Sequence, residues 1–116
     1  MLKNKKIAVI GLGYVGLPLL VELSRKFSTK GFDLSEKRII QLKKGKDLTN
    51  EVSSKDLNNL KSVLTCDEGD ISKENVYIVT VPTPIDKNKE PDLEPLRGAC
   101  QCIGKYLKRN DIVIFE

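Results

Sequence analysis

The sequence predicts an α/β fold in which a parallel sheet is covered by helices on both faces, a doubly wound arrangement. Two apolar, β-branched runs at residues 6–10 and 76–81 are typical of parallel strands buried on both faces. Segments of helical period alternate with these runs, at 14–26, 35–44 and 93–107. The length of 116 residues allows one domain with a modest core.

A glycine-rich loop joins the first strand to the first helix. It reads Gly11-Leu12-Gly13-Tyr14-Val15-Gly16 and stands at the strand-to-helix junction that the G-x-G-x-x-G pattern requires. In such a loop Gly11 allows a tight turn, Gly13 lets the backbone approach a pyrophosphate, and Gly16 lets helix and strand pack closely. The helix N-terminus adds free N–H groups and the positive end of its dipole. The loop therefore predicts a dinucleotide site, with Tyr14 and Val15 as part of it.

A weaker strand at 28–32 ends at Asp33, about twenty positions after Gly13. A carboxylate at this distance accepts hydrogen bonds from the adenosine ribose and disfavours NADP, whose 2′-phosphate it would face. We therefore expect NAD as the cofactor. The alternative is that Asp33 caps the helix at 35–44, a role that Ser35 can fill equally well.

Arg38 lies one turn into the helix at 35–44, close to the expected position of the adenine. Its planar guanidinium can stack on the base or bind a 2′-phosphate, and Asp33 favours stacking. A solvent-facing helix arginine is the third possibility. The polar segment that follows, 47–59, is longer than a simple connection requires, so we expect a purpose beyond linkage.

The strand at 76–81 runs into Pro82-Thr83-Pro84, where two prolines hold the backbone extended. Ligands of open α/β sheets lie beyond the carboxyl ends of the strands, where the strand order reverses. We therefore expect Pro82 and Thr83 to face the glycine loop across a cofactor cleft. A rigid loop without ligand contact is the alternative.

The last helix begins at the predicted cap Asp92, and its apolar stripe places Cys100 in the core with Cys102 on another face. The final strand, 111–115, has the pattern of a buried parallel strand. The chain stops at Glu116, directly after this strand, where a loop with functional groups is expected. We therefore expect residues 1–116 to be an incomplete fragment of a longer chain.

Composition excludes several classes of function. The net charge of +4 comes from 20 basic and 16 acidic residues, and the lysine clusters at 3–6 and 43–46 lack interleaved aromatic residues, which argues against nucleic-acid binding. No apolar run is long enough to cross a membrane, and the N-terminus does not form a signal peptide. Three cysteines and no histidine match no disulfide framework and no metal site. We expect reduced thiols in a cytoplasmic protein.

The ordered motifs resemble the UDP-glucose/GDP-mannose dehydrogenase family. The residues that carry the resemblance are the run at 6–18, Gly31-Phe32-Asp33 with Arg38, and the run at 79–84. The stretch at 82–93 is similar to the branch of UDP-N-acetylglucosamine and UDP-N-acetylgalactosamine 6-dehydrogenases. The resemblance covers essentially the whole chain and implies a Rossmann-like NAD-binding domain, truncated after about the fifth strand.

The resemblance implies oxidation of the C6 alcohol of a UDP-N-acetylhexosamine to a uronate for surface polysaccharides, with NAD as the hydride acceptor. The family's nucleophilic cysteine lies beyond residue 116, so no catalytic residue is expected within this fragment, which should be inactive alone. Thr83 matches a threonine that contacts the cofactor, and Glu116 matches the glutamate that opens a Glu-Ser-Thr loop. The UDP-sugar site is then mostly outside the fragment, and the parent enzyme is a homo-oligomer.

Two other functions stay open on the sequence. One is a stand-alone NAD-sensing or regulatory module, and the other is the NAD-binding half of a different hydroxyacid-type dehydrogenase. The residues that follow Glu116 in the gene would distinguish them.

Overall fold

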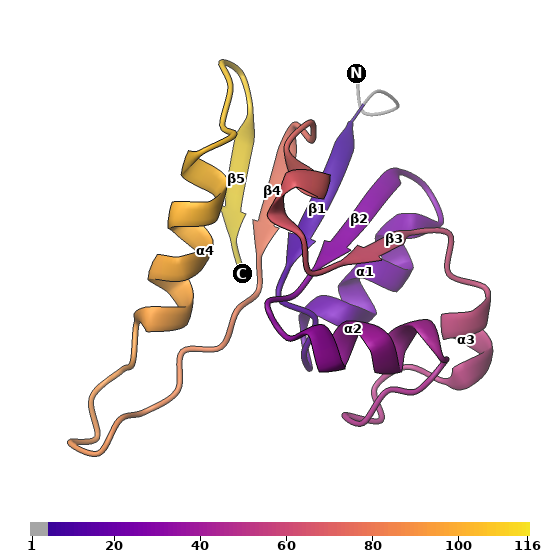
Figure 1. Ribbon diagram of the computed structural model, residues 1–116, viewed down its shortest axis with the longest axis horizontal. Coiled ribbons are helices and arrows are strands. Elements are labelled where there is room, and N and C mark those ends of the chain that lie inside the picture. The colour runs from indigo at the N-terminus through magenta and orange to yellow at the C-terminus, as the bar shows by residue number, and fades with distance from the viewer. Residues whose placement is uncertain (1–4) are drawn as a thin grey trace.

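The computed structural model describes residues 5–116, so part of the N-terminal lysine cluster at 3–6 lies outside the described residues. Five parallel strands form one sheet in the order β3-β2-β1-β4-β5 (Figure 1). The strands are β1 (Lys6–Ile10), β2 (Ser28–Phe32), β3 (Val63–Thr65), β4 (Val76–Val79) and β5 (Ile112–Phe115). The helices are α1 (Gly16–Ser24), α2 (Glu36–Lys43), α3 (Ser54–Asn58) and α4 (Glu94–Gly104). The predicted doubly wound α/β fold is confirmed.

The chain starts in the middle of the sheet and builds outward in both directions. From β1 it moves through β2 to β3 on one side, and then returns to the other side of β1 to form β4 and β5. The strand order therefore reverses between β1 and β4, and the carboxyl ends of these two strands lie together. This is where an open α/β sheet binds its ligand.

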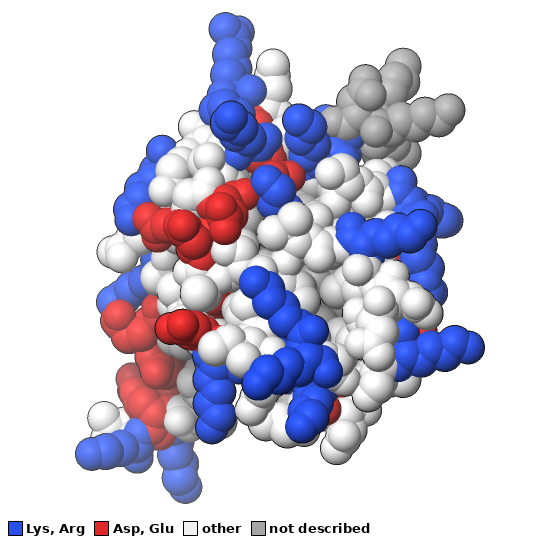
Figure 2. Space-filling model, turned by 45° about the vertical axis from the view of Figure 1, so that its right-hand side comes forward, with Lys and Arg blue, Asp and Glu red and all other residues white. Residues whose placement is uncertain are grey.

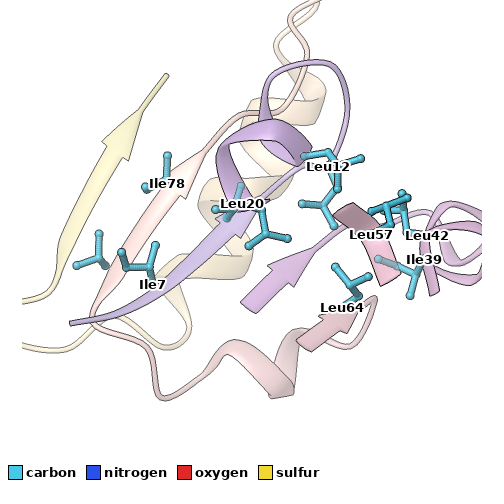
Figure 3. Close-up of a cluster of buried hydrophobic side chains, with 11 residues drawn as sticks. Ile7, Leu12, Leu20, Ile39, Leu42, Leu57, Leu64 and Ile78 are labelled. Atoms are coloured by element: carbon cyan, nitrogen blue, oxygen red, sulfur yellow. The ribbon is translucent and has the colours of Figure 1, made fainter. Parts of the chain in front are cut away.

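Two hydrophobic cores cover the two faces of the sheet, because successive side chains of a strand point to opposite faces. Ile7 and Val9 of β1 face the core beneath α1, α2 and α3 (Figure 3). Ala8 and Ile10 face the second core, which α4 covers. The second core also takes in Tyr77, whose hydroxyl donates to the carbonyl oxygen of Ile71 at 3.0 Å.

Two sequence expectations about burial are wrong. In α4 the buried residues are Ala99, Cys102 and Ile103, whereas Cys100 is exposed. The predicted stripe also included Leu93 and Leu107, which are 43% and 47% exposed and lie outside the helix, whereas its members Leu96 and Ile103 do pack in the core. The second error concerns β5, an edge strand whose apolar residues are partly open to solvent. Ile112, Ile114 and Phe115 are 44%, 43% and 59% exposed.

The ends of several elements differ from the sequence expectation by a few residues. Helix α1 begins at Gly16 rather than Tyr14, because the glycine loop continues through Val15. Strand β4 ends at Val79. Helix α2 ends where Gly45, at φ +78°, follows the last turn, and Lys46 N donates to the carbonyl oxygen of Gln41. Gly45 therefore occupies the position just after the C-cap residue, where a left-handed backbone favours glycine.

The surface carries basic side chains at many separate places. Figure 2 shows Lys and Arg spread over one face, with Asp and Glu gathered toward one side of it. Within residues 5–116, none of the helices combines the length and the apolar character that crossing a bilayer requires. In the same residues no three His, Cys, Asp or Glu side chains gather closely enough to hold a metal ion.

Candidate functional site

The glycine loop connects β1 to α1 at the point where the strand order reverses. Gly11 has φ +99°, and its N–H donates to the carbonyl oxygen of Phe32 at 2.8 Å, which ties the start of the loop to β2. A Cβ built on Gly16 would lie 1.7 Å from the Gly11 carbonyl oxygen. Gly11 and Gly16 are therefore required by the protein itself, one for backbone conformation and one for close packing.

Gly13 is different, because the protein supplies no reason for a glycine there. A Cβ built on Gly13 would meet no atom within 4 Å, and its φ is not positive. The space beside it is open, and a ligand pressed against the backbone would use that space. The residues of the loop therefore fit the pyrophosphate of a dinucleotide.

The peptide groups of Leu12, between the first two glycines, are held on both sides. The Leu12 N–H donates to Oδ2 of Asp33 at 2.9 Å, and the Leu12 carbonyl oxygen accepts from Nε of Arg38 at 2.8 Å. Two of the predicted site residues thus lie directly against the glycine loop. They fix its shape from positions 21 and 26 residues further along the chain.

Asp33 is not the N-cap of α2. Ser35 fills that position, and its hydroxyl accepts from the Arg38 N–H. The two carboxylate oxygens of Asp33 each accept one backbone N–H, from Leu12 and from Ser35. Because each carboxylate oxygen can accept more than one hydrogen bond, Asp33 keeps lone pairs for ribose hydroxyls.

Arg38 is not a solvent-facing helix arginine, since its side chain is only 12% exposed. Its Nη1 donates to Oδ1 of Asp47 at 2.9 Å, and the Asp47 side chain is fully buried. Nη2 of Arg38 is buried and has no hydrogen-bond partner among residues 5–116. Buried polar atoms are usually hydrogen-bonded, so this unmatched donor beside the loop sets Arg38 apart from a purely structural arginine.

Asp47 is a site residue that the sequence reasoning missed. Its carboxylate accepts from Arg38, from the backbone and hydroxyl of Thr49, and from the N–H groups of Glu51 and Val52. Burial alone would raise its pKa, but the hydrogen bonds from Thr49, Val52 and Arg38 outweigh burial and lower the pKa to about 2. Asp47 thus fixes the backbone at the start of the polar segment 47–59. Arg38 connects this segment to the glycine loop, because it donates both to Asp47 and to the Leu12 carbonyl oxygen. No local sequence pattern marks Asp47, because its role depends on the contact with Arg38.

Thr80 is a second residue that was missed, because it reads as part of an apolar strand. Its buried hydroxyl donates to the Gly11 carbonyl oxygen at 2.6 Å. The hydroxyl oxygen of Thr80 would also stand 2.4 Å from a Cβ on Gly16. Thr80 therefore joins the residue after β4 to the start of the glycine loop and leaves no room for a side chain at Gly16.

A cavity of about 130 Å³ opens beside the loop, at the carboxyl ends of the central strands. Gly11 and Asp33 line it from one side, and Val81 and Pro82 line it from the other. Helix α4 closes it with small residues, among them Gly98 and Ala99. Its walls are mostly apolar, which suits a flat heteroaromatic ring.

The remaining predicted residues lie at the same edge of the sheet but make fewer contacts. Tyr14 and Val15 are 68% and 54% exposed beside the loop. Thr83 is exposed and is not among the residues that line the cavity. The N–H of Glu116 donates to the carbonyl oxygen of Val79 at 2.9 Å, which sets it beside the end of β4.

Cys102 also lines the cavity, but its chemistry is inert. Burial, together with the nearby carboxylate of Glu68, raises the pKa of its thiol to about 11. The thiol therefore stays protonated at neutral pH, and a protonated thiol is a poor nucleophile.

The fold and the site together define a dinucleotide-binding α/β domain. Residues 5–116 match the model of the UDP-glucose/GDP-mannose dehydrogenase family, NAD binding domain. The chain belongs to this family, and the cofactor of its domain is NAD.

Similar proteins agree with this assignment. The chain is 51% identical over 116 residues to a UDP-N-acetyl-D-glucosamine 6-dehydrogenase of Pseudomonas aeruginosa, covering 99% of this chain and 28% of that protein. It is 47% identical over 112 residues to the enzyme of the same name from Salmonella typhi, covering 96% of this chain and 26% of that protein. Among solved structures, a UDP-D-ManNAc dehydrogenase from Pyrococcus horikoshii superposes with a TM-score of 0.88 at 28% identity, over 96% of this chain and 28% of that one. The chain thus spans little more than a quarter of the length of these relatives.

Proposed function

We propose that this chain is the NAD-binding part of a nucleotide-sugar 6-dehydrogenase, which oxidises the C6 alcohol of a UDP-N-acetylhexosamine to a uronate. The observation that carries the proposal is the 51% identity to a UDP-N-acetyl-D-glucosamine 6-dehydrogenase across the whole chain. The open space beside Gly13 and the clamped Leu12 peptide support it, because both fit a bound dinucleotide.

The chain's own residues bind and orient the cofactor. The N–H groups of the glycine loop and the N-terminus of α1 receive the pyrophosphate, and Asp33 accepts hydrogen bonds from the adenosine ribose. The apolar cavity, with Pro82 in its wall, receives the adenine. Arg38 belongs to the same site through its contact with the Leu12 carbonyl oxygen of the glycine loop. Bound NAD supplies the acceptor for a hydride. We assign Tyr14, Val15, Thr83 and Glu116 to the same site, and we assign the catalytic nucleophile to residues outside this chain.

The test is a turnover assay with the full-length protein. UDP-N-acetylglucosamine and UDP-N-acetylgalactosamine are each mixed with NAD, NADH is followed by absorbance, and the product is identified by mass spectrometry. NADH formed together with a UDP-linked uronate is the expected result. NAD binding without oxidation of either sugar would reject the UDP-N-acetylhexosamine 6-dehydrogenase function and favour a sensing module or a different dehydrogenase.

We also propose that the parent protein works in the cytoplasm as a homo-oligomer. The three free cysteines, Cys66, Cys100 and Cys102, support a reducing compartment. Cell fractionation tests the location, and light scattering of the purified protein tests the assembly. A monomeric mass across the working concentration range would reject the homo-oligomer.

A further inference from the structure

The ribose end of the candidate site carries two charges of opposite sign. Asp33 and Arg38 both bind the peptide groups of Leu12, one at its N–H and one at its carbonyl oxygen. Asp33 and Arg38 therefore contact the same residue, so a ribose bound by Asp33 would lie close to Arg38. In dinucleotide-binding domains an acidic residue here favours NAD, whereas a nearby arginine accommodates the 2′-phosphate of NADP. The motif by itself therefore leaves the cofactor preference divided.

Only two of the three nitrogen atoms of the Arg38 guanidinium donate a hydrogen bond within the described residues. Nε and Nη1 have acceptors, but Nη2 is buried and has none within the described part of the chain. A guanidinium attracts a phosphate through its charge, and Nη2 is a donor that residues 5–116 leave unmatched. Hydrogen bonding alone would not keep a 2′-phosphate away from Arg38.

The positive charge of Arg38 is paired with a carboxylate, although one of its hydrogen-bond donors has no acceptor within the described residues. The Asp47 carboxylate lies 2.9 Å from Nη1, and its side chain is fully buried. Four further hydrogen bonds, from Thr49, Glu51 and Val52, hold this carboxylate in place. A buried ion pair is screened little by solvent, so the positive charge is compensated locally.

We infer that Asp47 is a specificity-determining residue, which makes the site select NAD over NADP by neutralising Arg38 beside the ribose. This inference rests on the proposed NAD-binding function. Asp33 repels a 2′-phosphate directly, and Asp47 removes the attraction that Arg38 would otherwise supply. The polar segment 47–59, which is longer than a simple connection needs, thereby has a role in cofactor choice.

The test measures the dissociation constants of NAD and NADP by calorimetry with the full-length protein. The variants are Asp47→Asn, Arg38→Gln, the double variant, and the control Asp56→Asn. Asp56 lies in α3 of the same polar segment, so the control makes the same chemical change and the same change in net charge. Each variant is first checked for folding by circular dichroism.

In Asp47→Asn we expect the ratio of the two affinities to move toward NADP by about tenfold or more, because Arg38 keeps its charge and loses its counter-ion. In Asp47→Asn with Arg38→Gln the gain disappears, since no cation is left to attract the phosphate. In Asp56→Asn the ratio stays within about twofold of the unchanged protein, because this carboxylate does not pair with Arg38. A general effect of charge would move both single Asp variants alike and would overturn the inference.

Two other outcomes are informative. If the unchanged protein binds no NAD, the proposed function fails; if it binds NAD and Asp47→Asn leaves the ratio unchanged, only the inference fails. Should Asp47→Asn not fold, the double variant is compared with the unchanged protein, because it keeps the net charge and removes the buried ion pair. A tenfold or larger loss of NADP affinity relative to NAD affinity in that variant, about 1.4 kcal/mol, would show that Arg38 already binds the 2′-phosphate and would overturn the inference; a ratio within about twofold of the unchanged protein supports it.

Discussion

Gly16 lies so close to Gly11 that a Cβ on Gly16 would stand 1.7 Å from the Gly11 carbonyl oxygen. The same Cβ would stand 2.4 Å from the hydroxyl oxygen of Thr80. The first turn of α1 is thus seated on the end of β1, and β4 is joined to the same point through Thr80. Within the same loop, Gly13 faces open space, because a Cβ there would meet no atom within 4 Å.

Gly16→Ala and Gly13→Ala should therefore separate folding from binding. Gly16→Ala forces backbone apart, so we expect the free energy of unfolding to fall by about 1–3 kcal/mol, measured by denaturant titration. Gly13→Ala meets no protein atom and should leave the free energy of unfolding nearly unchanged, while it weakens NAD binding in calorimetry. Equal losses of stability in the two variants would contradict this division of roles.

Asp33→Ala should weaken NAD binding by about 1–3 kcal/mol, because it leaves ribose hydroxyls unmatched and frees the Leu12 N–H. Helix α2 should persist, since Ser35 caps it. Calorimetry gives the affinity, and circular dichroism gives the helix content. Unchanged NAD affinity in a folded protein would mean that Asp33 does not bind the ribose.

Stability should depend on pH in the acid range through Asp47. Its pKa is lowered from 3.8 to about 2, so the folded state binds this proton less readily than the unfolded state does. The stabilisation is fully present above pH 3.8 and is lost as the pH falls toward 2; it amounts to about 2 kcal/mol. Denaturant titrations of the unchanged protein and of Asp47→Asn, repeated across this range, should converge as the pH is lowered. Parallel curves would contradict the assignment.

The three cysteines should differ in their reaction with iodoacetamide. Cys66 and Cys100 are exposed and should be alkylated in the folded protein. Cys102 is buried, and burial raises the pKa of its thiol to about 11, so it should react only after unfolding. Peptide mass spectrometry of native and denatured samples measures the order. Early alkylation of Cys102 would show that α4 is turned differently.

The sequence by itself determined the features that depend on local geometry. The glycine spacing at Gly11, Gly13 and Gly16 predicts a turn between a strand and a helix, because Gly11 has a backbone requirement, Gly16 has a packing requirement, and Gly13 leaves space for a ligand. The position of Asp33 follows from the length of one β-α-β unit. The capping residue Ser35 acts on the helix that it adjoins, so the structure repeats what the sequence predicts.

Only the tertiary structure decided which residues meet across the chain. The Arg38 side chain reaches a carbonyl oxygen 26 residues earlier and a carboxylate 9 residues later, and no local pattern encodes such a pair. The face of α4 that is buried depends on where the helix begins relative to the sheet, which placed Cys102 inside and Cys100 outside. The periodicity of apolar residues indicates that a helix has a buried face, but packing against the sheet decides which residues lie on that face. The glycine loop was thus predictable, whereas the Asp47–Arg38 pair that supports it became visible only once the chain was folded.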